Sequence, residues 1–344
     1  MESATQRQHD SILVAIWMVT YNHEYYIEQA VESVMSQQTD FSFKLFIGED
    51  FSTDQTSKIC IELKLKYGNK IELKQRASNL GAMENAMQMY NECFYSGAIY
   101  VAMLEGDDYW TDPLKLQKQV DFLKKNPDYV MTGGSVAMYD ETLKTAIGTW
   151  FAGSKEKKFT LKESLQYGSG AATSSLMFRN IFHNRGLPTW FVDSPGGDWL
   201  LQAILLEHGD MYCFQETFGV FRRNHGSSAR ITVEGKLVDK PLLEVVSVSQ
   251  RNSLKTIDYV DAHYKNRYSK LLDVQRFACY KALFRRLFAF GFFKEAKQVA
   301  KDALKIINVK IIISNLYYFF MILILLLPNS ILTLGLASYK RLKR

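Results

Sequence analysis

The strongest constraint in this sequence is a regular alternation of apolar runs and amphipathic segments over the first 125 residues. Continuous apolar runs at 11–19 and 43–48 are typical of strands covered on both faces. Between them, apolar residues recur at helical spacing over 27–35. Further strands are expected at 70–74 and 100–104, and further helices at 52–67, 79–94 and 113–125. This alternation predicts an α/β fold with a Rossmann-like, mainly parallel sheet.

Local signals mark the ends of two of these helices. Ser52 and Gln55 have the spacing of a capping box, and Gly68 is a natural helix C-cap. Asp112 precedes Pro113, a residue well suited to the first position of a helix. We therefore expect one helix to start at Ser52 and another at Pro113.

Three polar loops follow predicted strands: "TYNHE" at 20–24, "EDFSTD" at 49–54 and "EGDDYW" at 105–110. Ligands of such sheets gather at the carboxyl ends of the strands, so the three loops should converge. Adjacent carboxylates repel unless a cation or a hydrogen-bond network compensates. The last loop therefore fits either a divalent metal site or a polar loop in which Asp112 caps the next helix. No GxGxxG follows the first strand, which argues against a dinucleotide-dependent dehydrogenase.

The composition is that of an ordinary globular protein, with 47% hydrophobic and 23% charged residues among 344. No stripe of Lys and Arg interleaved with aromatics is present, so we expect no nucleic-acid partner. The cysteines are scattered without a CxxC pair and fit a reduced core: Cys60, Cys93, Cys213 and Cys279. Residues 1–10 are polar, are expected to be disordered and lack the apolar core of a signal peptide. We expect the catalytic part to stay in the cytosol.

The chain is expected to divide into a catalytic domain at 11–235, a helical extension at 236–305 and an apolar tail at 306–344. Ile311–Leu327 is almost wholly apolar and close to the roughly 17–25 residues that span a bilayer. Pro328 interrupts the apolar sequence, and four cations follow near the end of the chain. These features predict a membrane-associated tail at the cytoplasmic face, either monotopic or single-pass. A buried helix of a C-terminal subdomain is the alternative.

Four motifs together resemble the family-2 glycosyltransferases of GT-A fold: "TYN", "GEDFSTDQT", "NLG…N" and "EGDDYW". The resemblance covers roughly residues 10–230. Many members carry two aspartates where this chain has Glu49-Asp50, and Gly-Ser where it has Phe51-Ser52. The resemblance implies a GT-A fold and a donor that is a nucleotide-diphosphate sugar, with a UDP sugar favoured.

The resemblance also implies roles for individual residues. Asp108 would ligate Mg²⁺ or Mn²⁺, and Asp107 would contact the ribose or orient the site. Asp50 would accept from the uracil imide N–H, and Tyr21 would stack on or flank the base. The remaining residues expected around the nucleotide sugar are Thr20, Asn22 and Glu49.

Three residues further along the chain complete the expected site. Asp198 opens a predicted helix and would act as the general base. Arg223 and His225 have the Arg-x-His spacing that often ends this domain in relatives. His225 would complete the metal shell or contact the diphosphate, and Arg223 would offset its charge.

These features predict an inverting, metal-dependent glycosyltransferase that acts on a hydroxyl of a glycan or lipid-linked acceptor in cell-surface polysaccharide or glycoconjugate synthesis. Inversion is what the resemblance implies, with a single base at Asp198 and direct displacement at the anomeric carbon. One alternative is a sugar nucleotidyltransferase, although such enzymes usually have a Gly-rich basic loop where this chain has "TYNHE". The other is a non-catalytic, membrane-bound protein that binds a sugar nucleotide.

Overall fold

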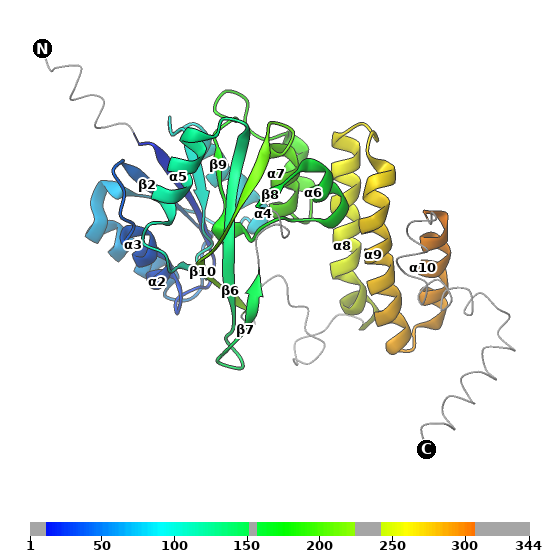
Figure 1. Cartoon of the computed structure of the whole chain (residues 1–344). Helices are drawn as coiled ribbons and strands as arrows, with labels where there is room; N and C mark the ends of the chain where they lie inside the picture. The colour runs from blue at the N-terminus through cyan, green and yellow to red at the C-terminus, as the bar shows by residue number, and fades with distance from the viewer. Residues whose placement is uncertain (1–11, 151–156, 224–241, 307–344) are drawn as a thin grey trace, which may run out of the picture. The chain divides into compact units, whose positions relative to one another are not determined.

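The computed structural model describes residues 12–150, 157–223 and 242–306 (Figure 1). The chain divides into two compact units. One comprises Met1–Ser164 and Gly168–Ser227, and the other comprises Leu165–Tyr167 and Ser228–Arg344. The boundary predicted near Gly235, the N-terminal residues 1–10 and the tail beyond Ile306 lie outside the described residues.

The first unit is built on one mixed sheet with the strand order β3-β2-β1-β4-β9-β6-β10-β5, in which β7 pairs with β6 and β8 with β10. The strands are β1 (Val14–Thr20), β2 (Phe43–Glu49), β3 (Ile71–Gln75), β4 (Tyr100–Met103), β5 (Tyr109–Trp110), β6 (Tyr129–Asp140), β7 (Thr145–Trp150), β8 (Lys158–Phe159), β9 (Met177–Arg179) and β10 (Asp210–Arg223). Strands β1 to β4 pair in parallel, and β6 pairs in parallel with β10. The expected α/β fold with a mixed, mainly parallel sheet is confirmed.

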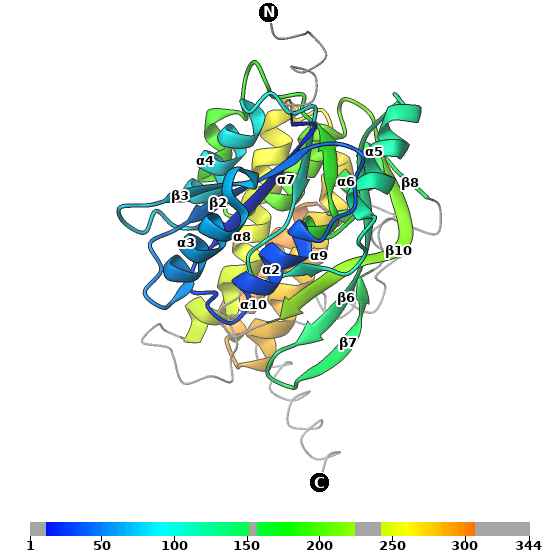
Figure 2. The same ribbon diagram turned by 90° about the vertical axis from the view of Figure 1, so that its left-hand side faces the viewer.

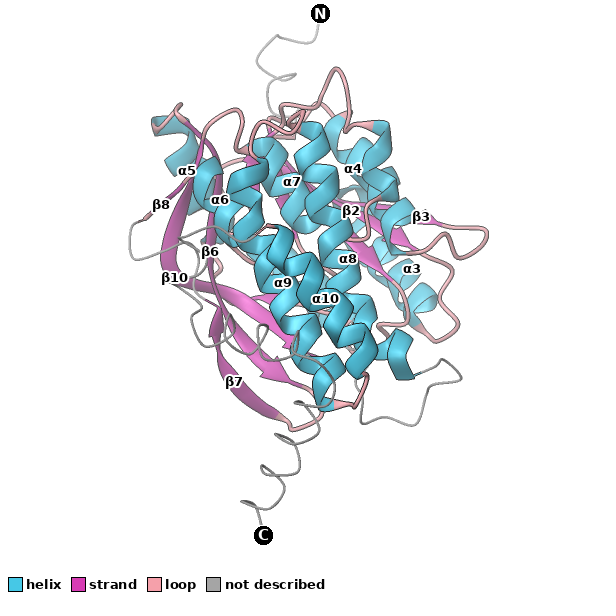
Figure 3. Ribbon diagram, turned by 90° about the vertical axis from the view of Figure 1, so that its right-hand side faces the viewer, coloured by secondary structure: helices cyan, strands magenta, loops and turns pink. Residues whose placement is uncertain are grey.

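Helices cover both faces of this sheet. They are α2 (Ile27–Met35), α3 (Thr56–Tyr67), α4 (Ala82–Phe94), α5 (Lys115–Lys125), α6 (Leu161–Tyr167) and α7 (Asp198–Leu205). Figure 2 shows α2 and α3 in front of one face, and Figure 3 shows α4 and α7 in front of the other. Residues 14–18 of the central strand β1 are therefore buried on both sides, as its apolar sequence predicted.

Two helices begin later than predicted. Helix α3 starts at Thr56, because the carboxylate of Asp54 accepts from the Thr56 backbone N–H at 2.9 Å and no capping box forms at Ser52. Helix α5 starts at Lys115, and Asp112 Oδ1 accepts from the Leu114 backbone N–H at 2.9 Å. Side chain–backbone bonds of this kind stabilise a turn before the first helical residue. The predicted C-cap Gly68 is confirmed, with φ of +57°.

The described part of the second unit consists mainly of three helices: α8 (Leu242–His263), α9 (Ser269–Ala289) and α10 (Phe293–Lys305). Helices α9 and α10 share a small core that contains Phe277, Phe284, Leu287, Ala296, Ala300 and Ala303. The expected helical C-terminal region is thus confirmed. Among the described residues, no helix is long and apolar enough to cross a membrane. The apolar run Ile311–Leu327 lies outside them.

Candidate active site

The three polar loops converge at the carboxyl ends of the parallel strands, as predicted. Thr20 at the end of β1 lies opposite Glu49 at the end of β2. Beyond β4 the chain continues beside β1, because the Leu104 and Gly106 backbone N–H groups donate to β1 carbonyls, each at 3.0 Å. This pairing carries the acidic loop, defined here as Glu105–Asp108, to the end of β1.

Asp108 is nearly fully buried, with 1% of its surface exposed. Its Oδ1 accepts a 2.8 Å hydrogen bond from the backbone N–H of Arg222. Its Oδ2 is also buried, and no described group donates a hydrogen bond to it. The hydroxyl of Ser174 lies close by without a hydrogen bond of normal geometry. Burial, and then the charge of Asp107, raise the pKa of Asp108 well above its ordinary value.

Arg222 connects the acidic loop to strands and helices far away in the sequence. Its guanidinium donates to Glu141 Oε1 at 2.9 Å, to the Asp107 carbonyl at 2.8 Å and to Gln29 Oε1. The same group lies 4.4 Å from the ring centre of Tyr109, which favours a cation–π interaction. The buried side chain thus fixes the loop through several partners at once.

The arginine predicted from the sequence is its neighbour, Arg223, which is exposed at the end of β10. Successive side chains of a strand point to opposite faces, so only one of two adjacent arginines reaches the acidic loop. Phe218, Val220 and Arg222 are buried along β10, whereas the side chains of Phe221 and Arg223 are more exposed and Gly219 has no side chain. This period of two was the signal in the sequence that identifies Arg222 as the inward residue.

His23 is a second residue of the site that was not predicted from the sequence. Its Nε2 lies 3.9 Å from Asp107 Oδ2, and its backbone N–H donates to Thr56 Oγ1 at 2.7 Å. Its Nδ1 and the Thr20 hydroxyl are buried, and neither has a hydrogen-bond partner among the described residues. A Cβ added to Gly106 would lie 3.1 Å from His23 Nδ1 and 2.8 Å from Thr20 Oγ1, which is too close for either contact. Glycine is therefore needed at the centre of this contact.

Asp50 holds the turn that precedes helix α4. Its two carboxylate oxygens accept from the backbone N–H groups of Leu80 at 2.8 Å and Gly81 at 3.0 Å. Its carbonyl accepts from the Asn79 side chain at 3.0 Å, and only 2% of the residue is exposed. These bonds give Asp50 a structural role, and its contact with a base stays a prediction.

The other residues expected around the nucleotide lie beside Asp50. Glu49 is buried and accepts from the Ser52 backbone N–H at 2.7 Å. Asn22 has φ of +54° and joins the first two loops by accepting from the Thr53 backbone N–H at 2.9 Å. Tyr21 is 41% exposed, so its ring is open for stacking.

Asp198 is the first residue of α7 and is exposed. The helix is anchored behind it, because Trp199 donates to Ser164 Oγ at 3.1 Å. The pKa of Glu105 is raised well above its ordinary value. Burial is the largest cause, followed by the negative charges of Asp108 and Asp107 and then by that of Asp198. Asp198 therefore lies close to the acidic loop, although 90 residues separate it from Asp108.

The residues present fit a divalent cation that takes most of its ligands from a substrate. No group of three His, Cys, Asp or Glu side chains in the described part of the chain is arranged to hold a metal by itself. Mg²⁺ is usually bound by one or two carboxylates together with phosphate oxygens and water. The unpartnered Oδ2 of Asp108 suits such a ligand. His225, the other predicted ligand, lies outside the described residues.

The family model for glycosyl transferase family 2 matches residues 15–186, which is half of the chain. The chain belongs to glycosyl transferase family 2. This membership agrees with the resemblance carried by the four loop motifs. The match includes the ends of β1, β2 and β4 but stops before Asp198 and Arg222.

Curated relatives match the chain over different lengths. An uncharacterized protein of Mycobacterium tuberculosis is 29% identical over 223 residues, which are 62% of this chain and 60% of that protein. The Escherichia coli enzyme WfgD, a UDP-Glc:alpha-D-GlcNAc-diphosphoundecaprenol beta-1,3-glucosyltransferase, is 28% identical over 124 residues. These residues are 36% of this chain and 46% of WfgD. The chain thus spans less than two thirds of the length of either relative.

The fold is also found in a solved structure. The mannosyltransferase PcManGT of Pyrobaculum calidifontis, solved with GDP-Man and Mn²⁺, is similar with a TM-score of 0.50 and 11% identity. The similarity covers 91% of this chain and 81% of PcManGT. At this identity the likeness concerns the fold, which agrees with the GT-A class expected from the sequence.

Proposed function

We propose that this family-2 member transfers a glycosyl group from a nucleotide-diphosphate sugar to a hydroxyl of a glycan or lipid-linked acceptor, with inversion. The observation that carries the proposal is the pairing of an exposed carboxylate, Asp198, with a partly buried acidic loop in which Asp108 is almost completely buried. Asp198 is exposed at the start of α7, and its charge acts on Glu105 beside Asp107 and Asp108. Glycosyl transfer needs an accessible base for the acceptor hydroxyl and, beside it, carboxylates that can hold a cation for the diphosphate leaving group.

In this proposal the acidic loop binds the diphosphate side of the donor. Asp108 Oδ2 would hold Mg²⁺ or Mn²⁺, with His225 as a second ligand or a diphosphate contact. The bound cation would neutralise negative charge on the diphosphate leaving group. Asp107 is oriented by Arg222 and His23 and would contact the ribose. Arg223, exposed next to this region, would offset phosphate charge.

The nucleotide would lie at the ends of β1 and β2. The exposed ring of Tyr21 supports stacking on the base. Asn22 and Thr20 line the same loop, and the Asp50 carboxylate, although engaged with two backbone amides, retains further lone pairs for a base N–H. A UDP sugar is our favoured donor, as it is for the relative WfgD by its name.

Asp198 would act as the general base. Its carboxylate would take the proton of the acceptor hydroxyl while that oxygen bonds to the anomeric carbon. The bond from the anomeric carbon to the diphosphate oxygen would break, and the diphosphate would leave with the electron pair. One displacement from the opposite face inverts the anomeric configuration.

We also propose that the enzyme works at the cytoplasmic face of a membrane. The support is the sequence of the tail, in which Ile311–Leu327 is apolar and the last residues are basic. This location suits a lipid-linked acceptor, the kind named for WfgD. Polysaccharide or glycoconjugate synthesis is the corresponding biological role.

A panel of sugar nucleotides tests the proposal. The full chain should release nucleoside diphosphate from one donor among UDP, dTDP, GDP and ADP sugars in the presence of Mn²⁺, and EDTA should abolish the release. The same donor should raise the melting temperature only with the metal present. If no donor is hydrolysed and none stabilises the folded protein, the proposed activity is wrong.

A further inference from the structure

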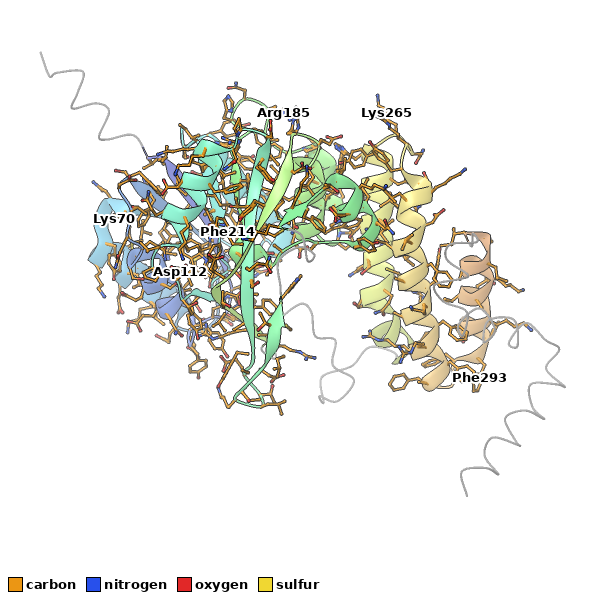
Figure 4. The ribbon with its side chains drawn as sticks, in the orientation of Figure 1. Lys70, Asp112, Arg185, Phe214, Lys265 and Phe293 are labelled. Atoms are coloured by element: carbon orange, nitrogen blue, oxygen red, sulfur yellow. The ribbon has the colours of Figure 1, made fainter. Side chains whose placement is uncertain are left out.

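The turn between α9 and α10 presents phenylalanine side chains to the solvent. Phe290 is 40% exposed and Phe293 is 46% exposed. Figure 4 shows Phe293 at the end of the α9–α10 hairpin. We call Ala289–Phe293 the aromatic turn. Phenylalanine has no polar group that favours exposure to water, so two such rings at one turn indicate a contact surface.

The aromatic turn has a defined backbone conformation. The Phe292 N–H donates to the Leu287 carbonyl at 2.8 Å, and the Gly291 N–H donates to the Phe288 carbonyl at 3.1 Å. Gly291 has φ of +81°, which a residue without a Cβ adopts readily. The Phe293 ring also packs against Phe288 with ring centres 5.3 Å apart. These hydrogen bonds fix the backbone of the turn, and Phe288 holds the ring of Phe293 in place.

Helix α10 carries a row of lysines that starts at this turn. Lys294, Lys297, Lys301 and Lys305 are spaced by three, four and four residues, so they lie along one face of the helix. We call these four residues the lysine stripe, which extends over roughly 16 Å at 1.5 Å per residue. The opposite face packs against α9 through Ala296, Ala300 and Ala303.

The positive charge of the lysine stripe is largely uncompensated. Lys305 pairs with Asp302 at 2.7 Å, whereas no described acidic side chain forms an ion pair with the other three lysines. Residues 269–305 contain nine Lys or Arg against three Asp or Glu. This excess equals the formal net charge of +6 for the whole chain. The hairpin therefore concentrates the positive charge of the protein.

We propose that the aromatic turn and the lysine stripe dock on the surface of a membrane that contains anionic lipids. Aromatic side chains favour the boundary between headgroups and acyl chains, and lysines favour anionic headgroups. Charge complementarity thus selects an anionic bilayer over a neutral one. The position in the chain supports this occupant, because the apolar sequence Ile311–Leu327 begins five residues after Ile306, the last described residue.

This surface is distinct from the apolar tail, and it would give the chain a second point of contact with the bilayer. Attachment of the chain to a bilayer at a single point would leave the helical hairpin free to turn away from the surface. A second contact made by α10 would restrict its orientation. This inference concerns the second unit alone and does not depend on the proposed glycosyl transfer.

A fluorescent probe on the turn distinguishes this contact from that of the tail. Phe293→Cys, labelled with an environment-sensitive dye in the full chain, reports the local surroundings. Cys279→Ala serves as the background, because Cys60, Cys93 and Cys213 are buried and Cys279 is partly exposed. The matched control is Leu65→Cys, at a residue that is 78% exposed on α3. The protein is reconstituted with phosphatidylcholine vesicles in which about one third of the lipid is the anionic phosphatidylglycerol.

We expect the emission of the probe at residue 293 to shift to the blue and to be quenched several-fold by spin-labelled lipids. The probe at residue 65 should stay in a watery environment. If the chain is bound to vesicles while the probe at residue 293 remains accessible only to a water-soluble quencher, the proposal is wrong. A blue shift without lipid, accompanied by a dimer in solution, would assign the surface to a second copy of the chain instead.

Charge reversal tests the lysine stripe. The variant K294E/K297E/K301E should lose most of the blue shift at residue 293 in anionic vesicles. The control K58E/K124E/K125E changes the net charge equally at three exposed lysines of the first unit and should keep the shift. An equal loss of the blue shift in both variants would show that net charge alone governs it, and the proposed role of the lysine stripe would then be wrong. Circular dichroism checks that both variants remain helical.

Discussion

The backbone N–H of Arg222 donates a 2.8 Å hydrogen bond to Asp108 Oδ1, which joins the end of β10 to the acidic loop across 114 residues of sequence. The same arginine binds the Asp107 carbonyl through its guanidinium. One residue therefore fixes both the backbone and the side chain of the adjacent aspartates. Oδ2 of Asp108 is then the carboxylate oxygen without a hydrogen-bond donor among the described residues, and it is the oxygen that we expect to bind a cation.

Replacing Asp108 with Asn tests its role as metal ligand. The amide oxygen can still accept from the Arg222 N–H, while the negative charge is lost. We expect metal-dependent donor hydrolysis to fall below detection, because stabilisation of the leaving group by a metal is worth several kcal/mol. Mn²⁺ titrations of hydrolysis and of the melting temperature measure the effect. Near-normal activity would exclude Asp108 as a required ligand. Asp193→Asn, the same substitution at an exposed aspartate, serves as the control and should leave hydrolysis unchanged.

Replacing Arg222 with Met should destabilise the first unit by about 2–3 kcal/mol, because the buried guanidinium and its hydrogen bonds to the Asp107 carbonyl and Gln29 are lost, and the half-buried Glu141 keeps only the exposed Lys144 as an ion-pair partner. Arg223→Met is the matched control and should change the stability by less than about 0.5 kcal/mol, since the side chain is exposed. Urea denaturation followed by tryptophan fluorescence gives both values. Equal effects of the two variants would refute the central role of Arg222. Arg222→Lys should recover little, because lysine lacks the planar fork of donors.

Replacing Asp198 with Asn should lower glycosyl transfer by roughly 10²–10⁴-fold, because the amide cannot take the proton of the acceptor. Donor affinity, measured by calorimetry with Mn²⁺ present, should stay unchanged. Asp193→Asn is the control, since this acid is also exposed and lies five residues earlier. An equal loss of donor affinity and of transfer would make Asp198 a binding or structural residue.

Lys115 gives a prediction on pH and stability. It is fully buried, it donates to Gln119 Oε1 at 2.8 Å, and it lies 4.1 Å from the ring centre of Trp110. Burial lowers the pKa of Lys115 well below its ordinary value. Between this lowered pKa and the unfolded value near 10.4, the unfolded chain binds more protons, so stability rises with pH.

The wild type should therefore gain stability relative to Lys115→Met as the pH rises from 7 to 10. The comparison with the methionine variant removes the contribution of all other titrating groups. Lys125→Met, at an exposed lysine, should show no such trend. Urea midpoints at several pH values provide the measurement. A difference between wild type and Lys115→Met that is constant over this range would show that Lys115 does not titrate differently in the folded state.

Much of the first unit could be predicted from the sequence because its signals are local. An apolar run such as residues 14–18 must be covered on both faces, and the alternation of strands and helices fixes the parallel order of the first strands. Once the strands are parallel, their following loops must meet at one edge. The meeting of Thr20, Glu49 and the acidic loop therefore follows from the sequence pattern alone.

Only the tertiary structure decided which atoms of these loops form hydrogen bonds within the protein and which stay available to a ligand. Asp50 is held by backbone amides of the turn before α4, and Asp108 keeps one unpartnered oxygen because Arg222 occupies the other. The proximity of Asp198 to Glu105 depends on how α7 packs. Such relationships join residues far apart in the chain, and hydrogen bonding and burial depend on three-dimensional neighbours that no local pattern specifies. The sequence by itself determined where the site would form, and the packing decided the chemical state of each residue in it.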